Sequence, residues 1–180
     1  MVGAGLVGLG AARALRRRYP DADITVLEKE HAPGQHQSTH NSGVLHAGLY
    51  YRPGSARARL AVRGIRLMKA FCERHGVAHE SCGKIVVAAD DAEIPRLRAL
   101  HDRGEANGLT GLRWLTEAEA IEREPAVRAR AALLVPEEGI VDFAGVVRAL
   151  AAELAGEGVR IVARAPVTGM TRIGLEWTVR

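Results

Sequence analysis

The sequence has few of the features that mark secreted, membrane-spanning or nucleic-acid-binding proteins. It holds only two cysteines, and its N-terminus lacks the charged and apolar regions of a secretory signal. We therefore expect a reducing compartment and a cytoplasmic location, with association at the inner face of a membrane left open. No apolar run is long enough to span a bilayer. Aromatic residues make up 4% of the chain and the net charge is only +4, so a nucleic-acid partner is not expected.

Carboxylates are absent from one long segment. Residues 31–72 contain no Asp or Glu, and within them the stretch 36–51, HQSTHNSGVLHAGLYY, holds three histidines, two tyrosines and several hydroxyl or amide side chains. Such a segment offers many hydrogen-bond donors and no negative charge. It is therefore suited to an anionic ligand. The rest of the composition, 47% hydrophobic and 26% charged, is that of an ordinary globular protein.

A glycine pattern stands at the start of the chain. Gly3, Gly5 and Gly8 form G-x-G-x-x-G, apolar residues then recur at helical spacing, and the acid Glu28 closes the next apolar strand. In a Rossmann-type unit the first glycine permits a tight turn, the second lets amides approach a pyrophosphate, and the third permits close packing. The acid bonds ribose hydroxyls and would repel the 2′-phosphate of NADP. The pattern predicts a site for an adenine dinucleotide.

Helical and strand patterns alternate along the remaining chain. Strands are expected at residues 24–27, 84–88, 159–163 and 175–179, with a further strand and turn within 131–143. Helices are expected over 56–75 between Ser55 and Gly76, from Asp90 or Asp91 to about 107, after a Thr116–Glu119 capping box, and from Asp142 to about 155. The apolar face of the helix over 56–75 is expected at Leu60, Gly64, Leu67, Met68 and Phe71.

This order predicts an α/β fold. Residues 1–76 and 139–180 would form a discontinuous, Rossmann-like FAD-binding domain, and residues 77–138 would be part of an inserted α+β substrate or cap domain. FAD is favoured over NAD because a plain NAD unit passes soon from its second strand to a crossover helix. In this sequence a donor-rich segment and a whole insertion come first. Neutral donors for a flavin would come from Gln37, Ser38, Asn41 and Ser42.

The stretch HQSTHNSGVLHAGLYYRPGSARARLAVRG closely resembles the L-2-hydroxyglutarate dehydrogenase/oxidase family, within the FAD-dependent oxidoreductases of the D-amino-acid-oxidase type. The stretches CGKIVVA, EREPAV and EEGIVDF fit the same family in the same order. The resemblance covers essentially the whole chain, which would be about the N-terminal half of such a protein. A shorter pattern, His46-x-Gly48-Leu49-x-Tyr51, is also similar to FAD-dependent glycerol-3-phosphate dehydrogenases.

The resemblance implies FAD as the cofactor and extends the set of residues that would contact it. Residues 36–43 would run along the flavin, and Val167 would bracket the adenine through its backbone. With the glycine motif included, the expected cofactor-binding set is Gly3, Gly5, Leu6, Val7, Gly8, Glu28, Lys29, His36, Gln37, Ser38, Asn41, Ser42, Gly43 and Val167.

The implied reaction oxidises L-2-hydroxyglutarate, a 2-hydroxy dicarboxylate, to 2-oxoglutarate. The C2 hydrogen leaves as hydride to flavin N5 while a base takes the hydroxyl proton, and oxygen or a quinone accepts the electrons. His46 is the candidate base, because histidine titrates near working pH; a structural or flavin-contacting role is the alternative. Tyr50 and Tyr51 would orient the substrate, or pack.

The same residues permit other interpretations. His36, His40 and His46 have no Asp, Glu or Cys among them and match no common zinc spacing, so no metal is expected. The arginines of residues 52–66 would bind a dicarboxylate or, as is favoured, form a solvated helix face. The alternative functions are a related flavoenzyme acting on glycerol 3-phosphate or an amino acid, and a non-catalytic dinucleotide-binding module.

Both ends of the chain are expected to be incomplete. Only Met1 and Val2 precede the first glycine, where a buried strand of about five or six residues is usual. The C-terminal strand is still in progress at Val179. We therefore expect a piece of a longer protein, and we expect these residues alone to bind FAD poorly and to be inactive.

Overall fold

The helix that follows the glycine turn belongs to a unit built from two separate parts of the chain. The structure, a computed structural model, describes residues 1–180. Met1–Ser42 and Asp142–Arg180 form one compact unit, and Gly43–Val141 forms a second. The division therefore falls after residue 42, whereas the domain boundary expected from the sequence falls after residue 76. Which ligand each unit binds stays a prediction.

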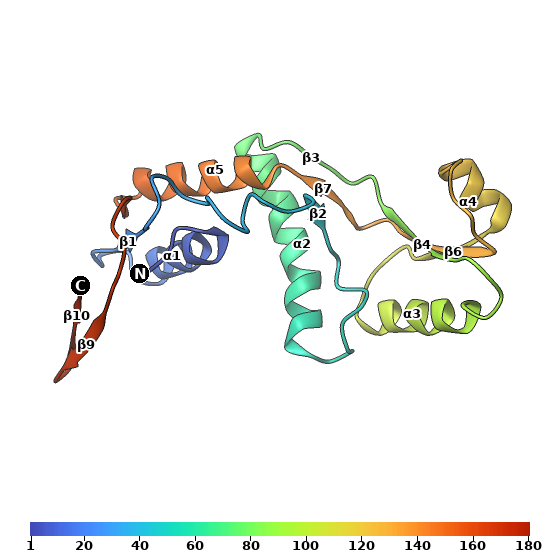
Figure 1. The fold of residues 1–180 in the computed structure, drawn as a ribbon, viewed down its shortest axis with the longest axis horizontal. Helices are drawn as coiled ribbons and strands as arrows, with labels where there is room; N and C mark the ends of the chain where they lie inside the picture. The colour runs from blue at the N-terminus through green and yellow to red at the C-terminus, as the bar shows by residue number, and fades with distance from the viewer. The chain divides into compact units, whose positions relative to one another are not determined.

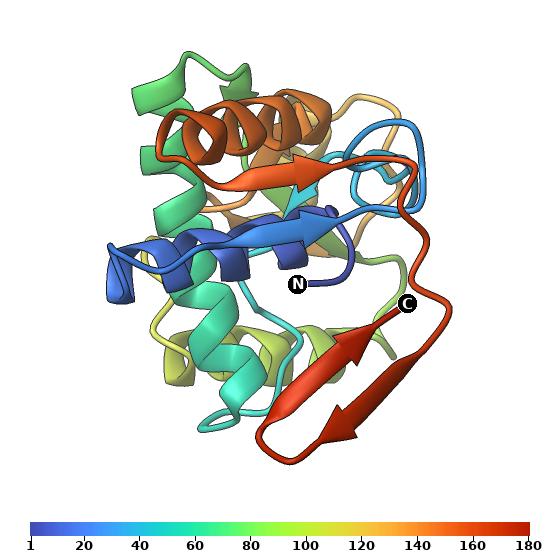
Figure 2. The same ribbon diagram turned by 90° about the vertical axis from the view of Figure 1, so that its left-hand side faces the viewer.

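The first unit contains a short parallel sheet. β1 (Thr25–Leu27) pairs in parallel with β8 (Arg160–Val162), and Val2 adds a parallel bridge to Leu27. Figure 2 shows the blue β1 and the orange β8 side by side although they are far apart in the sequence. α1 (Leu6–Arg18) packs against α5 (Phe143–Gly156). The strands expected at 24–27 and 159–163 are thus confirmed and lie together, as a Rossmann-like unit requires.

A β-hairpin ends the first unit, drawn in red in Figure 1. It consists of β9 (Met170–Ile173) and β10 (Glu176–Val179), which pair antiparallel. β10 confirms the strand expected at 175–179. β9 was not predicted from the sequence.

The second unit contains two antiparallel sheets of three strands. In one, β6 (Ala131–Val135) lies between β4 (Lys84–Ala88) and β5 (Arg113–Thr116), and all five residues of β6 are buried. In the other, β7 (Gly139–Val141) lies between β2 (Val44–Leu45) and β3 (His79–Glu80). The stretch expected to form a strand and a turn is therefore two strands. Apolar side chains of β4, β5 and β6 pack with Ala120 to form the core beside the β4–β6–β5 sheet.

Helix ends in the second unit follow the capping rules. α2 (Ala56–His75) begins where the Ser55 hydroxyl accepts a hydrogen bond from the Ala58 N–H and ends at Gly76, whose φ is +63°. α4 (Glu117–Arg123) has the expected capping box. α3 (Ile94–Ala106) begins later than expected, because Asp90 caps a preceding turn by accepting from the Glu93 N–H.

The buried face of α2 differs from the expected one. Leu60 and Leu67 are 66% and 57% exposed and Gly64 is exposed too. Phe71 is buried as expected, but its buried neighbours are Ala58, Ile65 and Cys72. The helix carries two apolar stripes, and the sequence pattern does not rank them. Gly48 approaches the helix closely, and a Cβ on Gly48 would lie 2.9 Å from the Ala61 Cβ. The expectation for Leu60 and Leu67 was therefore wrong.

Two further expectations concern Asp142 and the membrane. Asp142 precedes α5 as expected, but its carboxylate accepts from Arg148 and makes no side-chain cap bond. None of the helices combines the length and the apolar character that crossing a membrane requires.

Candidate dinucleotide site

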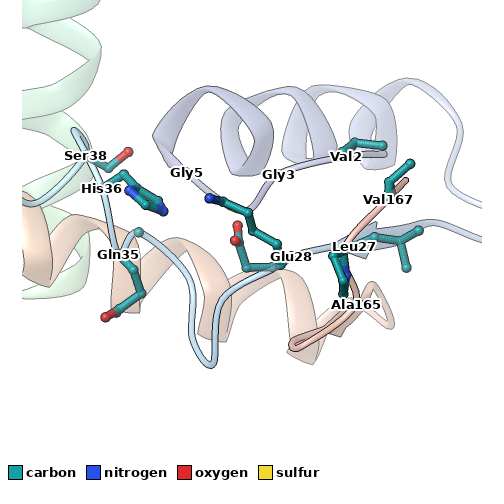
Figure 3. Close-up of a pocket in the computed structure, with 13 residues that line it drawn as sticks. Val2, Gly3, Gly5, Leu27, Glu28, Gln35, His36, Ser38, Ala165 and Val167 are labelled. Carbon is teal, nitrogen blue, oxygen red and sulfur yellow. The ribbon is translucent and has the colours of Figure 1, made fainter. Parts of the chain in front are cut away.

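A cavity of about 350 Å³ lies within the first unit, where the glycine turn meets the end of β1 (Figure 3). Three segments that are distant in the sequence enclose it: the chain around Gly3, the loop after β1, and the chain that follows β8. Its lining residues are Val2, Gly3, Gly5, Leu27, Glu28, Lys29, Gly34, Gln35, His36, Ser38, Ala165, Pro166 and Val167.

Each glycine of the motif is required for a different steric reason. Gly3 has a φ of +91°, which L side chains rarely adopt. A Cβ on Gly5 would lie 2.9 Å from the Ser38 Oγ, at the edge of the cavity. A Cβ on Gly8 would lie 1.9 Å from the carbonyl oxygen of Gly3. The third glycine therefore lets α1 close against the turn itself, and the second keeps the cavity open at the start of the helix.

The first turn of α1 is capped by a residue from the donor-rich segment. Gly5 offers no side chain as an N-cap, and the Leu6 N–H donates instead to the Ser38 Oγ at 2.9 Å. Because this oxygen accepts from Leu6, its own hydrogen is free to point toward another acceptor. A hydroxyl donor at the positive end of a helix dipole, beside a glycine turn, suits a phosphate oxygen.

Glu28 is held rigidly at the floor of the cavity. The side chain is buried, its Oε2 accepts from the Ala4 N–H at 2.7 Å, and its Oε1 accepts from the Glu30 N–H at 3.0 Å. Figure 3 shows the carboxylate directed toward the glycine turn. Burial raises the pKa of the Glu28 carboxyl, but the backbone hydrogen bonds from Glu30 and Ala4 outweigh it, so the pKa lies below its ordinary value of 4.5. Each oxygen keeps a lone pair that a ribose hydroxyl can use.

We expect Glu28→Gln to weaken both the fold and cofactor binding. The two oxygens accept from two different N–H groups, so the glutamine NH₂ must face a backbone donor, at a cost of about 1–3 kcal/mol. The lowered pKa means that the carboxylate's stabilisation is present above the unfolded-state pKa and is lost as pH falls through the folded-state value. Urea unfolding measured from about pH 7 down to about pH 3 should show a shallower acid loss for the variant.

FAD titration of the full-length protein that carries this chain completes this test. Affinity should fall about tenfold to a hundredfold for Glu28→Gln, because a charged acceptor for the ribose is lost. Asp21→Asn is the matched control, since that carboxyl is exposed and lies outside the cavity. Equal affinity in Glu28→Gln and the parent protein would contradict the role of Glu28.

Glu30 adds a negative charge that the acid-free segment did not lead us to expect. Its Oε1 lies 2.9 Å from the His36 Nε2 and 3.2 Å from the Lys29 Nζ. The hydrogen bond from His36, followed by that from Lys29, lowers the pKa of the Glu30 carboxyl. Glu30 directly precedes the acid-free segment, and its contact with His36 places a negative charge against the start of that segment.

The structure brings together only part of the expected cofactor-binding set. The cavity is lined by Gly3, Gly5, Glu28, Lys29, His36, Ser38 and Val167 from that set. The members that do not line it are Leu6, Val7, Gly8, Gln37, Asn41, Ser42 and Gly43. Among the latter, Val7 is 88% exposed, Asn41 donates to the carbonyls of Gln37 and Ser38, and Gly43 belongs to the second unit. Their contact with a cofactor stays a prediction.

Several lining residues were missed from the sequence. Gly34 has a φ of +75° and its N–H donates to the Ala4 carbonyl, which holds the loop against the glycine turn. The Pro33–Gly34 pair was the available signal for this turn. No sequence signal marked Gln35, Ala165 or Pro166 as lining residues, because their place in the cavity depends on the tertiary fold.

A second polar cluster lies within the second unit, around the candidate base. His46 is 57% exposed at its side chain, and its Nδ1 lies 3.4 Å from the Oε2 of Glu138, which is completely buried. The Lys84 Nζ lies 2.5 Å from the same oxygen and 4.7 Å from the centre of the Tyr50 ring. Glu138 and Lys84 were not predicted as site residues. Tyr50 and Tyr51 are both exposed, and the roles expected for them stay predictions.

The arginines of residues 52–66 lie on the surface. All five are exposed. Arg59 donates to the Gly54 carbonyl and Arg66 pairs with Glu137. This arrangement agrees with the favoured interpretation, a solvated helix face.

The first unit combines a glycine turn, a buried acid directly after β1 and a parallel strand pair. These features define a dinucleotide-binding α/β protein. The chain belongs to the FAD-dependent oxidoreductase family called DAO, whose model matches residues 1–180. It is 44% identical over 170 residues to L-2-hydroxyglutarate dehydrogenase of Escherichia coli (strain K12), covering 94% of this chain and 40% of that protein. It is 41% identical to the mitochondrial L-2-hydroxyglutarate dehydrogenase of Homo sapiens, covering 94% and 37%.

Solved structures agree with this assignment. L-alpha-glycerophosphate oxidase from Mycoplasma pneumoniae, with FAD bound, matches with a TM-score of 0.90 and 27% identity over 99% of this chain and 47% of its own. Glycine oxidase from Geobacillus kaustophilus matches with a TM-score of 0.85 and 25% identity, covering 99% and 49%. The chain spans about two fifths of the curated relatives. The predicted fold class, the resemblance and FAD as the family's cofactor are confirmed.

Proposed function

We propose that the protein carrying this chain oxidises L-2-hydroxyglutarate to 2-oxoglutarate and uses FAD as the oxidant. The observation that carries the proposal is the 44% identity to an L-2-hydroxyglutarate dehydrogenase, which extends over 94% of the chain and so includes the polar cluster around His46 and Glu138. The substrate is a small 2-hydroxy dicarboxylate. The electron acceptor is oxygen or a quinone, and the location is the cytoplasm or the inner face of a membrane.

The cavity of the first unit supports FAD as its ligand. Its donors and acceptors suit the adenosine diphosphate half: the first turn of α1 and Ser38 for a phosphate, and the spare lone pairs of Glu28 for ribose hydroxyls. A Cβ on Gly5 would lie 2.9 Å from the Ser38 Oγ, so the glycine leaves room beside this hydroxyl for the proposed phosphate. Val167 and Pro166 offer an apolar wall for the adenine.

The polar cluster of the second unit supports the chemical half of the proposal. When bound, FAD supplies a hydride acceptor at the flavin N5. We propose that His46 takes the proton from the substrate hydroxyl, because its side chain is exposed on one side and held by Glu138 on the other. A base that is oriented by a third group is the usual arrangement for such proton transfer.

Anaerobic mixing with substrate tests the proposal. L-2-hydroxyglutarate should bleach the yellow absorbance of the flavin in the full-length protein, whereas D-2-hydroxyglutarate should not. Bleaching by glycerol 3-phosphate instead would favour the second candidate, which the likeness to the Mycoplasma oxidase supports. If neither these substrates nor amino acids bleach the flavin, the remaining candidate is a non-catalytic dinucleotide-binding module. Oxygen consumption on turnover separates an oxidase from a quinone-linked dehydrogenase.

A further inference from the structure

We propose that Glu138 is a positioning residue that holds His46 in the tautomer needed for proton abstraction. The inference rests on the proposed function, in which His46 is the base, and adds a residue that acts through it. Glu138 is the feature that needs explanation, because its side chain is completely buried. A buried carboxylate is costly unless hydrogen bonds and an opposite charge compensate it.

Glu138 has a hydrogen bond, an opposite charge and one further neighbour. Its Oε1 accepts from the Ala47 N–H at 3.1 Å, and Lys84 supplies the counter-charge at Oε2. These two groups give Oε1 a hydrogen bond and the carboxylate an opposite charge, but the buried Oε2 has no hydrogen-bond partner. The third neighbour is the Nδ1 of His46, 3.4 Å from the same Oε2. Hydrogen bonds within active sites are often long before the substrate binds, so this separation is compatible with a directing contact.

Strand register explains why these residues meet. β2 pairs antiparallel with β7, with Val44 opposite Ile140 and Leu45 opposite Gly139. One step further along the same register sets His46 opposite Glu138. The pairing of β4 with β6, in which Lys84 lies opposite Val135, brings the lysine to the same turn. The cluster is therefore set by backbone pairing and not by flexible loops.

The turn that carries Glu138 is held from both sides. The Gly83 N–H donates to the Glu138 carbonyl at 2.9 Å, and the Glu138 N–H donates to the Val135 carbonyl at 3.3 Å. The next residue, Gly139, is packed so closely that a Cβ would lie 2.0 Å from the carbonyl oxygen of Glu80. These contacts hold the Glu138 carboxylate within the small positional tolerance that an oriented proton transfer requires.

The chemistry follows from the donor and acceptor inventory. An ionised carboxylate only accepts hydrogen bonds, so a hydrogen bond between His46 and Glu138 requires the Nδ1 of His46 to carry its hydrogen toward Glu138. In the neutral ring the Nε2 then has the lone pair. Nε2 would then take the substrate hydroxyl proton, with the O–H bond breaking as the N–H bond forms, and bound FAD would supply the acceptor for the C2 hydrogen and its electron pair. Glu138 itself exchanges no proton.

The test compares Glu138→Gln with Glu137→Gln in the full-length holoenzyme. The glutamine NH₂ can face Nδ1 and favour the other tautomer, so the limiting rate of anaerobic flavin reduction should fall by roughly 10²-fold with substrate affinity changed less than about threefold. Glu137 is the neighbouring acid, bonded to Arg66 and Thr110, and its variant should reduce at the parent rate. A Glu138→Gln rate within about threefold of the parent would overturn the inference.

Nitrogen NMR of the parent holoenzyme gives a readout that needs no Glu138 variant. The His46 signals, identified by their loss in His46→Gln, should show Nδ1 protonated and Nε2 unprotonated near neutral pH. The opposite tautomer would overturn the inference even if Glu138→Gln does not fold. If L-2-hydroxyglutarate does not reduce the flavin of the parent protein, the proposed function fails. The tautomer of His46 is measured without substrate, so it tests the role of Glu138 separately.

Discussion

Gly8→Ala should lower FAD affinity by about 10²- to 10⁴-fold in the full-length protein. The new Cβ would lie 1.9 Å from the Gly3 carbonyl oxygen, and this neighbour is backbone, so α1 or the turn must move. Gly3 and Gly5 line the cavity, and Ser38, which caps α1 at the Leu6 N–H, lies at the end proposed for the phosphate. Two or so hydrogen bonds to charged phosphate oxygens, at about 1.5–3 kcal/mol each, would be misaligned.

Gly10→Ala is the matched control for this variant. Gly10 lies two residues further along the same helix, is exposed, and has no atom within 4 Å of the position that its Cβ would take. Alanine there should stabilise the helix by about 0.5–1 kcal/mol and leave FAD affinity unchanged. Fluorescence titration of the flavin measures both variants. If Gly8→Ala binds as tightly as Gly10→Ala, the proposed phosphate site at the turn is wrong.

His46→Gln should slow flavin reduction by L-2-hydroxyglutarate by about 10²- to 10⁴-fold, the usual contribution of a general base. FAD should stay bound, because His46 belongs to the unit that does not contain the cavity. Stopped-flow absorbance under anaerobic conditions gives the limiting rate, and dithionite should still reduce the flavin at the parent rate.

His101→Gln serves as the control for a histidine lost from the same unit. His101 lies on α3 beside Asp102 and Glu105, away from the Glu138 contacts. Its variant should reduce as fast as the parent protein. A His46→Gln variant that is equally fast would show that the base is another residue.

Local signals accounted for most of the helix boundaries. Ser55 and Gly76 bound α2 as expected, and Thr116 and Glu119 form the expected capping box. These predictions succeed because a cap is an interaction between residues three or four positions apart, which the order of residues alone specifies.

Two of the unpredicted elements, β2 and β3, are short and depend on a distant partner. β2 and β3 have two residues each, and both pair with β7. Two residues carry no recognisable alternation, so no periodic signal exists for them. The error on α2 has another reason: the helix carries two apolar stripes, and only tertiary packing decides which one is buried.

The sequence by itself determined the glycine turn, the acid that closes β1 and hence a dinucleotide site, because these features depend on residue type and on short spacing. Only the tertiary structure decided that Ser38 caps α1, that Glu28 is bonded to Ala4, and that Glu138 meets His46. Ser38 and Leu6 are separated by 32 residues, Glu28 and Ala4 by 24. Contacts over such separations follow from chain pairing and packing, in which many alternative pairings compete, and the order of residues along the chain does not display them.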